Sequence, residues 1–270
     1  MLMERLYRNK WGRALLKVLQ ASGAFRIASW FLRTRASGIL VPGYIAKNQI
    51  DMAPFKGQRY SSFAGFFARK RGETGFVPEA DVLISPCDSR LRVYPVSPEA
   101  SLHMKGSMYR LTDLIPDKEA AGLFREGLFL VFRLEASDYH HFCSFDDMVL
   151  RETHYIPGQL HSVQPIALQT VPVFRLNRRW WRLMHTSHFG TAAQIEIGAM
   201  LVGGVSYVKE SGLLARGEEM GNFELAGSTI VLLLDAERRQ RLTFFPEVAE
   251  AIIAGKEVKV TMGEGIGRLI

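Results

Sequence analysis

Most of the chain after residue 80 carries short apolar runs or alternates apolar with polar residues, and both patterns predict β-strands. Apolar runs of strand length occupy residues 82–84, 91–93, 127–134 and 230–234. Residues 194–205 alternate instead, which indicates a strand with one buried face. That face would carry Ile195, Ile197, Ala199 and Leu201.

Helical signals are fewer and lie mostly at the two ends of the chain. Residues 36–60, rich in Gly and Pro, predict a connector with a short helix. Phe63, Phe66 and Phe67 would share one helical face after serine caps. Residues 246–254 predict a helix that ends at Gly255. We therefore expect an α+β fold, with a mostly antiparallel β core and peripheral helices.

The positive charge is concentrated at the start of the chain. The formal net charge is +7, and residues 1–35 hold eight bases and one acid, so the remainder is neutral. A nucleic-acid-binding body would carry its excess charge on the folded surface, so we expect no nucleic-acid partner. Charges interrupt every apolar run before the roughly 18 residues needed to span a bilayer, and no secretory signal is expected.

Residues 1–50 are instead typical of a basic amphipathic helical arm that lies on an anionic membrane surface. The alternative is a helical hairpin packed on its own domain or on a second subunit. The two cysteines, Cys87 and Cys143, are far apart and lack the spacing of metal ligands. They indicate free thiols in a reducing compartment and no metal site.

A Gly-Ser pair directly before the apolar run at 230–234 is the sharpest chemical signal. Such a pair is usually a turn that leads into a strand. Attack of the Ser228 hydroxyl on the Gly227 carbonyl would instead give an ester, and elimination would then leave a pyruvoyl group on the new amino terminus. Asp88, in a turn, and His140 offer a carboxylate and a base for the Ser228 hydroxyl. A serine hydrolase could use the same three residues, but Ile230 breaks the Gly-x-Ser-x-Gly elbow.

Seven motifs, taken together in this order, resemble the phosphatidylserine decarboxylase family over roughly residues 55–265. They are Phe63-Ala64-Gly65-Phe66-Phe67-Ala68-Arg69, Ser85-Pro86-Cys87-Asp88, Asp138-Tyr139-His140, Gly158-Gln159-Leu160-His161-Ser162-Val163, Phe189-Gly190, Gly198-Ala199, and Glu219-Met220-Gly221-x-Phe223 through Gly227-Ser228-Thr229.

The resemblance implies a self-cleaving, pyruvoyl-dependent lyase with a catalytic domain at 51–270. Cleavage between Gly227 and Ser228 would give chains of 227 and 43 residues, and the cofactor would be a pyruvoyl group derived from Ser228. The group would form a Schiff base with the amine of phosphatidylserine and release CO2 to give phosphatidylethanolamine. The resemblance also implies a peripheral protein at the cytoplasmic face of the cell membrane, with a homodimer as the expected assembly.

The resemblance further implies roles for single residues. Asp88 matches the family's triad aspartate, and His140 matches the first histidine of an Asp-Tyr-His-x-x-His motif whose second histidine is Cys143 here. We assign the base to His140, with His141 or His161 as alternatives; Cys143 would line the pocket or act as a thiolate base. His161 or backbone amides would stabilise the developing oxyanion.

Other assignments remain open on the sequence. Lys105 and the basic stretch 178–182 could contact phosphate, or that stretch could be a charged strand edge. A pyruvoyl enzyme for a soluble amino acid, an uncleaved serine hydrolase and a non-enzymatic peripheral membrane protein are the alternatives for function.

Overall fold

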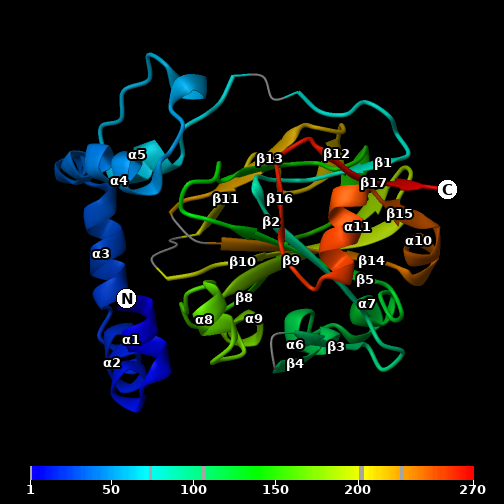
Figure 1. Cartoon of the computed structure of the whole chain (residues 1–270), viewed down its shortest axis with the longest axis horizontal. Helices are drawn as coiled ribbons and strands as arrows, with labels where there is room; N and C mark the ends of the chain where they lie inside the picture. Colours follow the sequence, from blue (N-terminus) through cyan, green and yellow to red (C-terminus); the bar gives the residue numbers. More distant parts are fainter. Residues whose placement is uncertain (1, 73–74, 105–106, 201–203, 226–227) are drawn as a thin grey trace.

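A computed structural model describes residues 2–72, 75–104, 107–200, 204–225 and 228–270 (Figure 1). The fold is α+β, as the pattern predicts, and is organised around one large antiparallel sheet with strand order β12-β7-β9-β10-β14-β5-β2-β16 and β8 paired to β9. The strands are β2 (Ser89–Pro95), β5 (Leu128–Leu134), β7 (Met148–Leu150), β8 (His154–Ile156), β9 (Arg179–Thr186), β10 (Thr191–Ile197), β12 (Gly212–Leu214), β14 (Ser228–Leu234) and β16 (Val258–Val260).

A smaller sheet covers one face of the large one. It consists of β11 (Val205–Tyr207), β13 (Glu219–Phe223) and β6 (His141–Cys143). The Tyr207 hydroxyl donates to Glu196 of β10 at 2.9 Å, so the Glu196 side chain points toward this sheet. Glu196 pairs with Ile230 of β14. Because side chains alternate along a strand, Ser228, two residues before Ile230, points to the same covered face.

The remaining elements close the ends and the other face of the core. A three-stranded sheet and a hairpin lie beside short helices (Figure 1). They are β1 (Val82–Ile84), β17 (Gly265–Leu269), β15 (Leu242–Phe244), β3 (Ser101–Met104), β4 (Ser107–Arg110), α6 (Leu111–Leu114), α7 (Lys118–Gly122), α8 (Pro165–Leu168), α9 (Val173–Leu176), α10 (Ala236–Arg241) and α11 (Pro246–Ile253).

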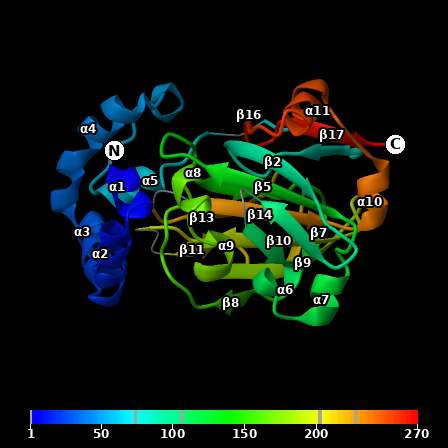
Figure 2. The same cartoon turned by 60° about the horizontal axis from the view of Figure 1, so that its bottom comes forward.

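Residues 2–67 form a helical column along one flank of the core (Figures 1 and 2). Its elements are α1 (Leu2–Arg8), α2 (Lys10–Ala21), α3 (Ala24–Arg33), the 3-10 turn η1 (Arg35–Ile39), α4 (Leu40–Asn48), η2 (Ala53–Phe55) and α5 (Phe63–Phe67). Leu6, Tyr7 and Leu16 belong to the main apolar core. A second apolar cluster joins α4 to α5 and Leu225. The column is thus packed on the body of the protein.

Several expected elements are confirmed. Ser62 caps α5 by accepting from the Gly65 N–H, β5 occupies the apolar run 128–134, and α11 precedes Gly255, whose φ is 62°. The predicted helix within 36–60 is α4.

Three expectations were wrong. The basic apolar stretch at residues 1–35 predicts one or two amphipathic helices, whereas residues 2–33 hold three, because Asn9 caps α2 and Gly23 separates α2 from α3 at φ 74°. The strand expected at 194–205 ends at Ile197. It ends there because the Gly198 N–H donates to the Arg178 carbonyl oxygen (3.0 Å) and the Gly198 carbonyl oxygen accepts from the Asn177 side-chain amide (2.7 Å). Leu201 lies outside the described residues. The stretch 178–182 is not a sheet edge, because its residues 179–181 pair with β8 on one side and with β10 on the other.

Across the described ranges, every helix is too short or too polar to cross a membrane.

Candidate active site

Ser228 begins a central strand of the large sheet. It pairs with Leu134 of β5, and its side chain is fully buried. Its Oγ has no hydrogen-bond partner among the described residues. Burying a hydroxyl without a partner costs about 1–3 kcal/mol of folding free energy. The position of Ser228 therefore needs a functional explanation. Gly227, the other half of the predicted cleavage site, lies outside the described residues.

His140 lies just before β6, in the layer that covers the Ser228 face. Its carbonyl accepts from the Phe223 N–H at 2.9 Å, and its ring meets Phe67 edge-on with centroids 4.4 Å apart. The Nδ1 atom lies 2.9 Å from the Asp138 carbonyl oxygen. A carbonyl can only accept, so Nδ1 carries the hydrogen and Nε2 presents a lone pair.

The Nε2 atom of His140 is buried and has no partner in the described part of the chain. Burial lowers the His140 pKa to about 3, although the Asp138 carbonyl and the Asp88 charge act in the opposite direction. The imidazole is therefore neutral near pH 7. Two buried groups in facing layers, the Ser228 hydroxyl and an imidazole nitrogen with a free lone pair, thus lack partners among the described residues.

Asp88 occupies the turn between β1 and β2, as expected. Its carboxylate accepts from the Met262 N–H at 2.9 Å and from Arg71 Nη1 at 3.2 Å, and it forms an ion pair with the same guanidinium. The structure gives no hydrogen bond between Asp88 and His140 among the described residues. Asp88 therefore reaches His140 through its charge, and the Asp138 carbonyl sets the tautomer.

His141 has both ring nitrogens facing acceptors. Nδ1 lies 2.8 Å from the Glu219 carboxylate and Nε2 lies 3.3 Å from the Ala68 carbonyl oxygen. The ring also stacks on Tyr139 with centroids 4.6 Å apart. A neutral imidazole carries one hydrogen and one lone pair, so the lone-pair nitrogen of His141 faces an oxygen that has no proton to give, and this geometry favours His140 as the base.

Cys143 is buried in β6. Burial raises its pKa to about 12, despite the nearby Arg216 charge. The thiol therefore stays protonated near pH 7, which favours the pocket-lining role over the thiolate base.

His161 lies at the junction with the helical column. Its Nε2 lies 2.7 Å from Gln159 Oε1, and its Nδ1 lies 3.4 Å from the Tyr7 hydroxyl. The Tyr7 oxygen also accepts from the Ser162 N–H at 2.8 Å. Burial lowers the His161 pKa, so this ring is neutral. Tyr7 is a contact that sequence reasoning missed, since nothing in the pattern of an arm marks one tyrosine as an anchor.

A buried polar cluster on the Ser228 face was also missed. Gln194 donates to Glu196 at 2.7 Å, Tyr207 donates to the same carboxylate, and the Arg182 guanidinium lies 4.0 Å above the Tyr207 ring. Arg182 and Glu196 are fully buried. In the sequence these residues look like the solvent side of alternating strands. Only the smaller sheet, which covers them, makes them part of the interior.

The predicted phosphate contacts divide among different surroundings. Arg179 is buried and donates to the Leu114 and Asp113 carbonyls at 3.1 and 2.6 Å, so its role is structural. Arg178 lines a cavity at the helical column. Lys105 lies outside the described residues. No cluster of three metal-ligating side chains occurs in the portion of the chain that the structure describes.

The α+β body holds a buried serine at the start of a strand and a neutral histidine in the layer above it. The candidate site therefore contains a hydroxyl nucleophile and a base. Comparison with known proteins assigns the family. The family model for phosphatidylserine decarboxylase matches residues 63–268, and the chain belongs to this family of decarboxylases.

Curated relatives agree with the family model over nearly the whole chain. The chain is 35% identical to phosphatidylserine decarboxylase proenzyme 2 of Clostridium acetobutylicum, covering 97% of this chain and 90% of that protein. It is 34% identical to the phosphatidylserine decarboxylase proenzyme of Desulfitobacterium hafniense (88% and 81%) and 33% identical to that of Clostridium kluyveri (95% and 88%).

Proposed function

We propose that this chain is a proenzyme that cleaves itself before Ser228 and then decarboxylates phosphatidylserine. The observation that carries the proposal is the pair of buried, unpartnered atoms, Ser228 Oγ and His140 Nε2, in facing layers. Both atoms have a use in the reaction, which accounts for their uncompensated burial. Membership of the family, and the word proenzyme in the names of its relatives, support the same conclusion.

Self-cleavage needs no external reagent other than water. His140 Nε2 takes the hydroxyl proton as Ser228 Oγ attacks the Gly227 carbonyl, and the amide becomes an ester. Loss of the Ser228 α-proton then expels the Gly227 carboxylate and leaves a carbon–carbon double bond. Hydrolysis of the resulting enamine releases ammonia and leaves a pyruvoyl terminus. Asp138 holds the histidine tautomer that these proton transfers require.

The buried setting of Ser228 also suits the group that would form there. A pyruvoyl ketone supplies an electron sink for the pair of electrons released when a carboxylate leaves as CO2. A proton that His140 Nε2 accepts earlier in the reaction, while Nδ1 stays bonded to the Asp138 carbonyl, would be available to the substrate carbon after CO2 has left. The apolar wall of Phe67 keeps bulk water from the imidazole. Such general acid–base catalysis is worth about 10²–10⁴-fold.

The helical column would hold the enzyme on the surface that contains its lipid substrate. Trp11 is 87% exposed and Trp30 is 68% exposed, and further large apolar residues are exposed on the same helices. They are Leu15, Val18, Ile27 and Phe31. Exposed apolar side chains among eight bases are what an anionic membrane interface attracts. We therefore propose a peripheral membrane protein with residues 1–50 as its membrane-binding segment and 51–270 as its catalytic domain.

A denaturing gel combined with release of labelled CO2 tests the proposal. The wild-type chain should give two bands and release CO2 from carboxyl-labelled phosphatidylserine. Ser228→Ala should remain one band and release none, whereas Ser187→Ala, a serine away from the site, should behave as wild type. A wild-type chain that stays whole would exclude the proposed maturation and favour an uncleaved hydrolase. Two bands with release from free serine, and none from the lipid, would indicate a soluble amino acid as substrate.

A further inference from the structure

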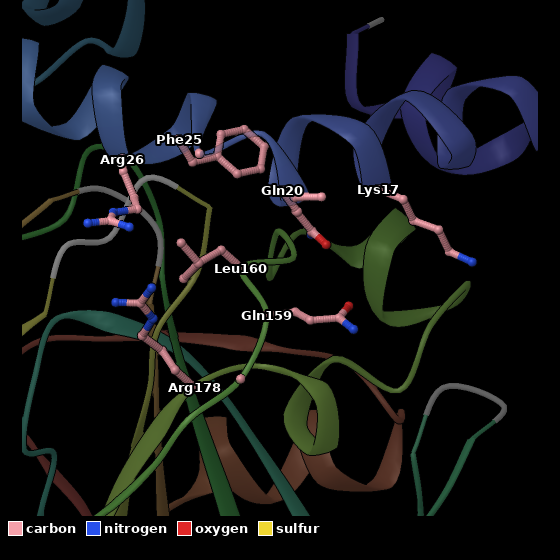
Figure 3. A pocket seen from close by; sticks show the side chains of 10 residues that line it. Lys17, Gln20, Phe25, Arg26, Gln159, Leu160 and Arg178 are labelled. Atoms are coloured by element: carbon pink, nitrogen blue, oxygen red, sulfur yellow. The ribbon is translucent and has the colours of Figure 1, made fainter.

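A cavity of about 420 Å³ separates the helical column from the catalytic body. The end of α2 and the start of α3 form one wall, and residues 158–160 with Arg178 form the other (Figure 3). Its volume lies within the range of small-molecule sites. The cavity shares no residue with the Ser228–His140 pair.

The charge of the lining is positive only. Lys17 and Arg26 enter from the arm and Arg178 from the body, and none of the described lining residues is acidic. In Figure 3 the guanidinium ends of Arg26 and Arg178 point into the same part of the cavity. Neither Lys17 nor Arg26 is paired with a carboxylate among the residues that the structure describes. An anion bound between Arg26 and Arg178 would reduce the repulsion between these two like charges.

A neutral donor adds to the cations. Gln20 Nε2 is buried against the cavity and has no hydrogen-bond partner within the described residues. Phe25 and Leu160 supply apolar surface beside the polar groups. Cationic forks, an amide donor and an apolar wall match a phosphate attached to an apolar body better than they match a free inorganic ion.

We propose that this cavity binds the phosphate of the phospholipid substrate, an inference that rests on the proposed function. The position of Arg178 relative to Ser228 supports the assignment. Its Cγ lies 3.1 Å from where a Cβ on Gly198 would stand, so the side chain lies against that glycine. Ile197 pairs with Thr229, and continuing this register by one residue puts Gly198 beside Ser228.

This arrangement puts the phosphate site and the reacting serine on one row across the sheet. Strands lie about 4.8 Å apart, so the Arg178 backbone is about 10 Å from Ser228. The arginine side chain spans part of that distance. A phosphoserine headgroup held at its phosphate can span the rest. The exposed Val18 and Ile27, which follow Lys17 and Arg26 directly, keep the acyl chains on the side of the arm. The arm would therefore contribute to substrate binding as well as to docking.

Binding of dihexanoyl phosphatidic acid to the full chain, followed by calorimetry below its micellar concentration, tests the site. This lipid has a phosphate and acyl chains but no serine to react, so the result is independent of whether the chain matures. Wild type should bind it. Arg26→Gln and Lys17→Gln should each weaken binding about tenfold, the loss of one charged hydrogen bond. The matched control is Arg35→Gln, which removes an exposed charge from the arm outside the cavity and should change binding less than twofold.

Two results would overturn the inference. Equal weakening by Arg26→Gln and Arg35→Gln would mean that the arm acts only through its total charge. Inorganic phosphate that binds as tightly as the lipid would mean a free-anion site. Arg26→Lys keeps the positive charge and serves as the control for misfolding. Its affinity for the lipid should lie between those of wild type and Arg26→Gln. If lipid binding follows the expected order while the chain never cleaves, the phosphate site stands and the proposed maturation fails.

Discussion

The Ser162 N–H donates to the hydroxyl of Tyr7 at 2.8 Å, and this contact joins two segments that are 155 residues apart. Tyr7 is fully buried, and the neighbouring His161 faces the same hydroxyl. The first helix is therefore anchored to the motif that contains His161, whatever its role at a membrane.

Tyr7→Phe should destabilise the folded chain. The substitution keeps the ring but leaves the Ser162 N–H buried without an acceptor, at a cost of about 1–3 kcal/mol. The midpoint of urea unfolding measures the effect. Tyr155→Phe changes an exposed tyrosine in the same way and should shift the midpoint little. Equal effects of the two substitutions would show that the Tyr7 contact does not stabilise the fold.

The exposed apolar residues of the arm should control membrane binding without affecting stability. Ile27→Ser and Trp30→Ser each remove apolar surface that water already contacts. The free energy of unfolding should therefore change by less than about 0.5 kcal/mol. Each should weaken co-sedimentation with anionic vesicles about 30-fold, because an inserted side chain of this size contributes about 2 kcal/mol.

The matched control for this experiment is Ile253→Ser. Ile253 is 87% exposed but lies on α11, on the side of the molecule away from the arm (Figure 1). Vesicle binding should be unchanged in this variant. If it falls as far as in Trp30→Ser, the arm is not the membrane-binding surface.

Replacing His140 should slow maturation more than replacing its neighbour. His140→Gln removes the only lone pair assigned to proton transfer, and cleavage should slow by about 10²–10⁴-fold. His141 has both nitrogens occupied, so His141→Gln should retain cleavage within about tenfold wherever the chain folds. Cleavage rates are read from gels of freshly synthesised protein. The reverse order would move the base to His141.

Acid should destabilise the protein through His140. Its pKa in the folded chain is about 3, below the 6.5 of an exposed histidine, so the unfolded chain binds the proton more readily. The stability that neutral His140 contributes is complete above pH 6.5 and is lost as the pH falls toward 3, at up to about 1.4 kcal/mol per pH unit. Unfolding of His140→Gln should depend less steeply on pH in that window than wild type. His103→Gln, at an exposed position, should match wild type; equal slopes in all three would contradict the buried neutral histidine.

The sequence predicted the parts of the fold that local pattern determines. The apolar runs of β5 and β14 could only be buried strands, and Ser62 before three phenylalanines indicated a capped helix. Pairing across long separations left no such signal. Arg71 holds Asp88 from a segment without periodicity, and Tyr7 reaches Ser162 from an arm whose composition suggested a membrane surface or a packed hairpin without marking any contact residue.

The candidate residues of the site come from the sequence, and their catalytic roles stay predictions; their contacts come from the structure. Ser228, His140 and Asp88 were identified through motifs, but the partner that fixes His140 is a backbone carbonyl, which every residue carries and no sequence pattern reveals. The buried Glu196 and Arg182 were missed for a related reason. Alternating polar residues indicate a solvent face unless a second sheet covers it, and that cover is formed by β11 and β13, beyond the strand itself.

The chemical identity of the residue before Thr229 is the central claim, and the intact mass of the carboxy-terminal fragment measures it most directly. The fragment of mature protein should begin with a pyruvoyl group and weigh less than the peptide from Ser228 to Ile270 by the mass of one ammonia. Treatment with borohydride should add two hydrogens to it. A fragment that carries an intact amino-terminal serine, or a chain that is never cut, would contradict the account.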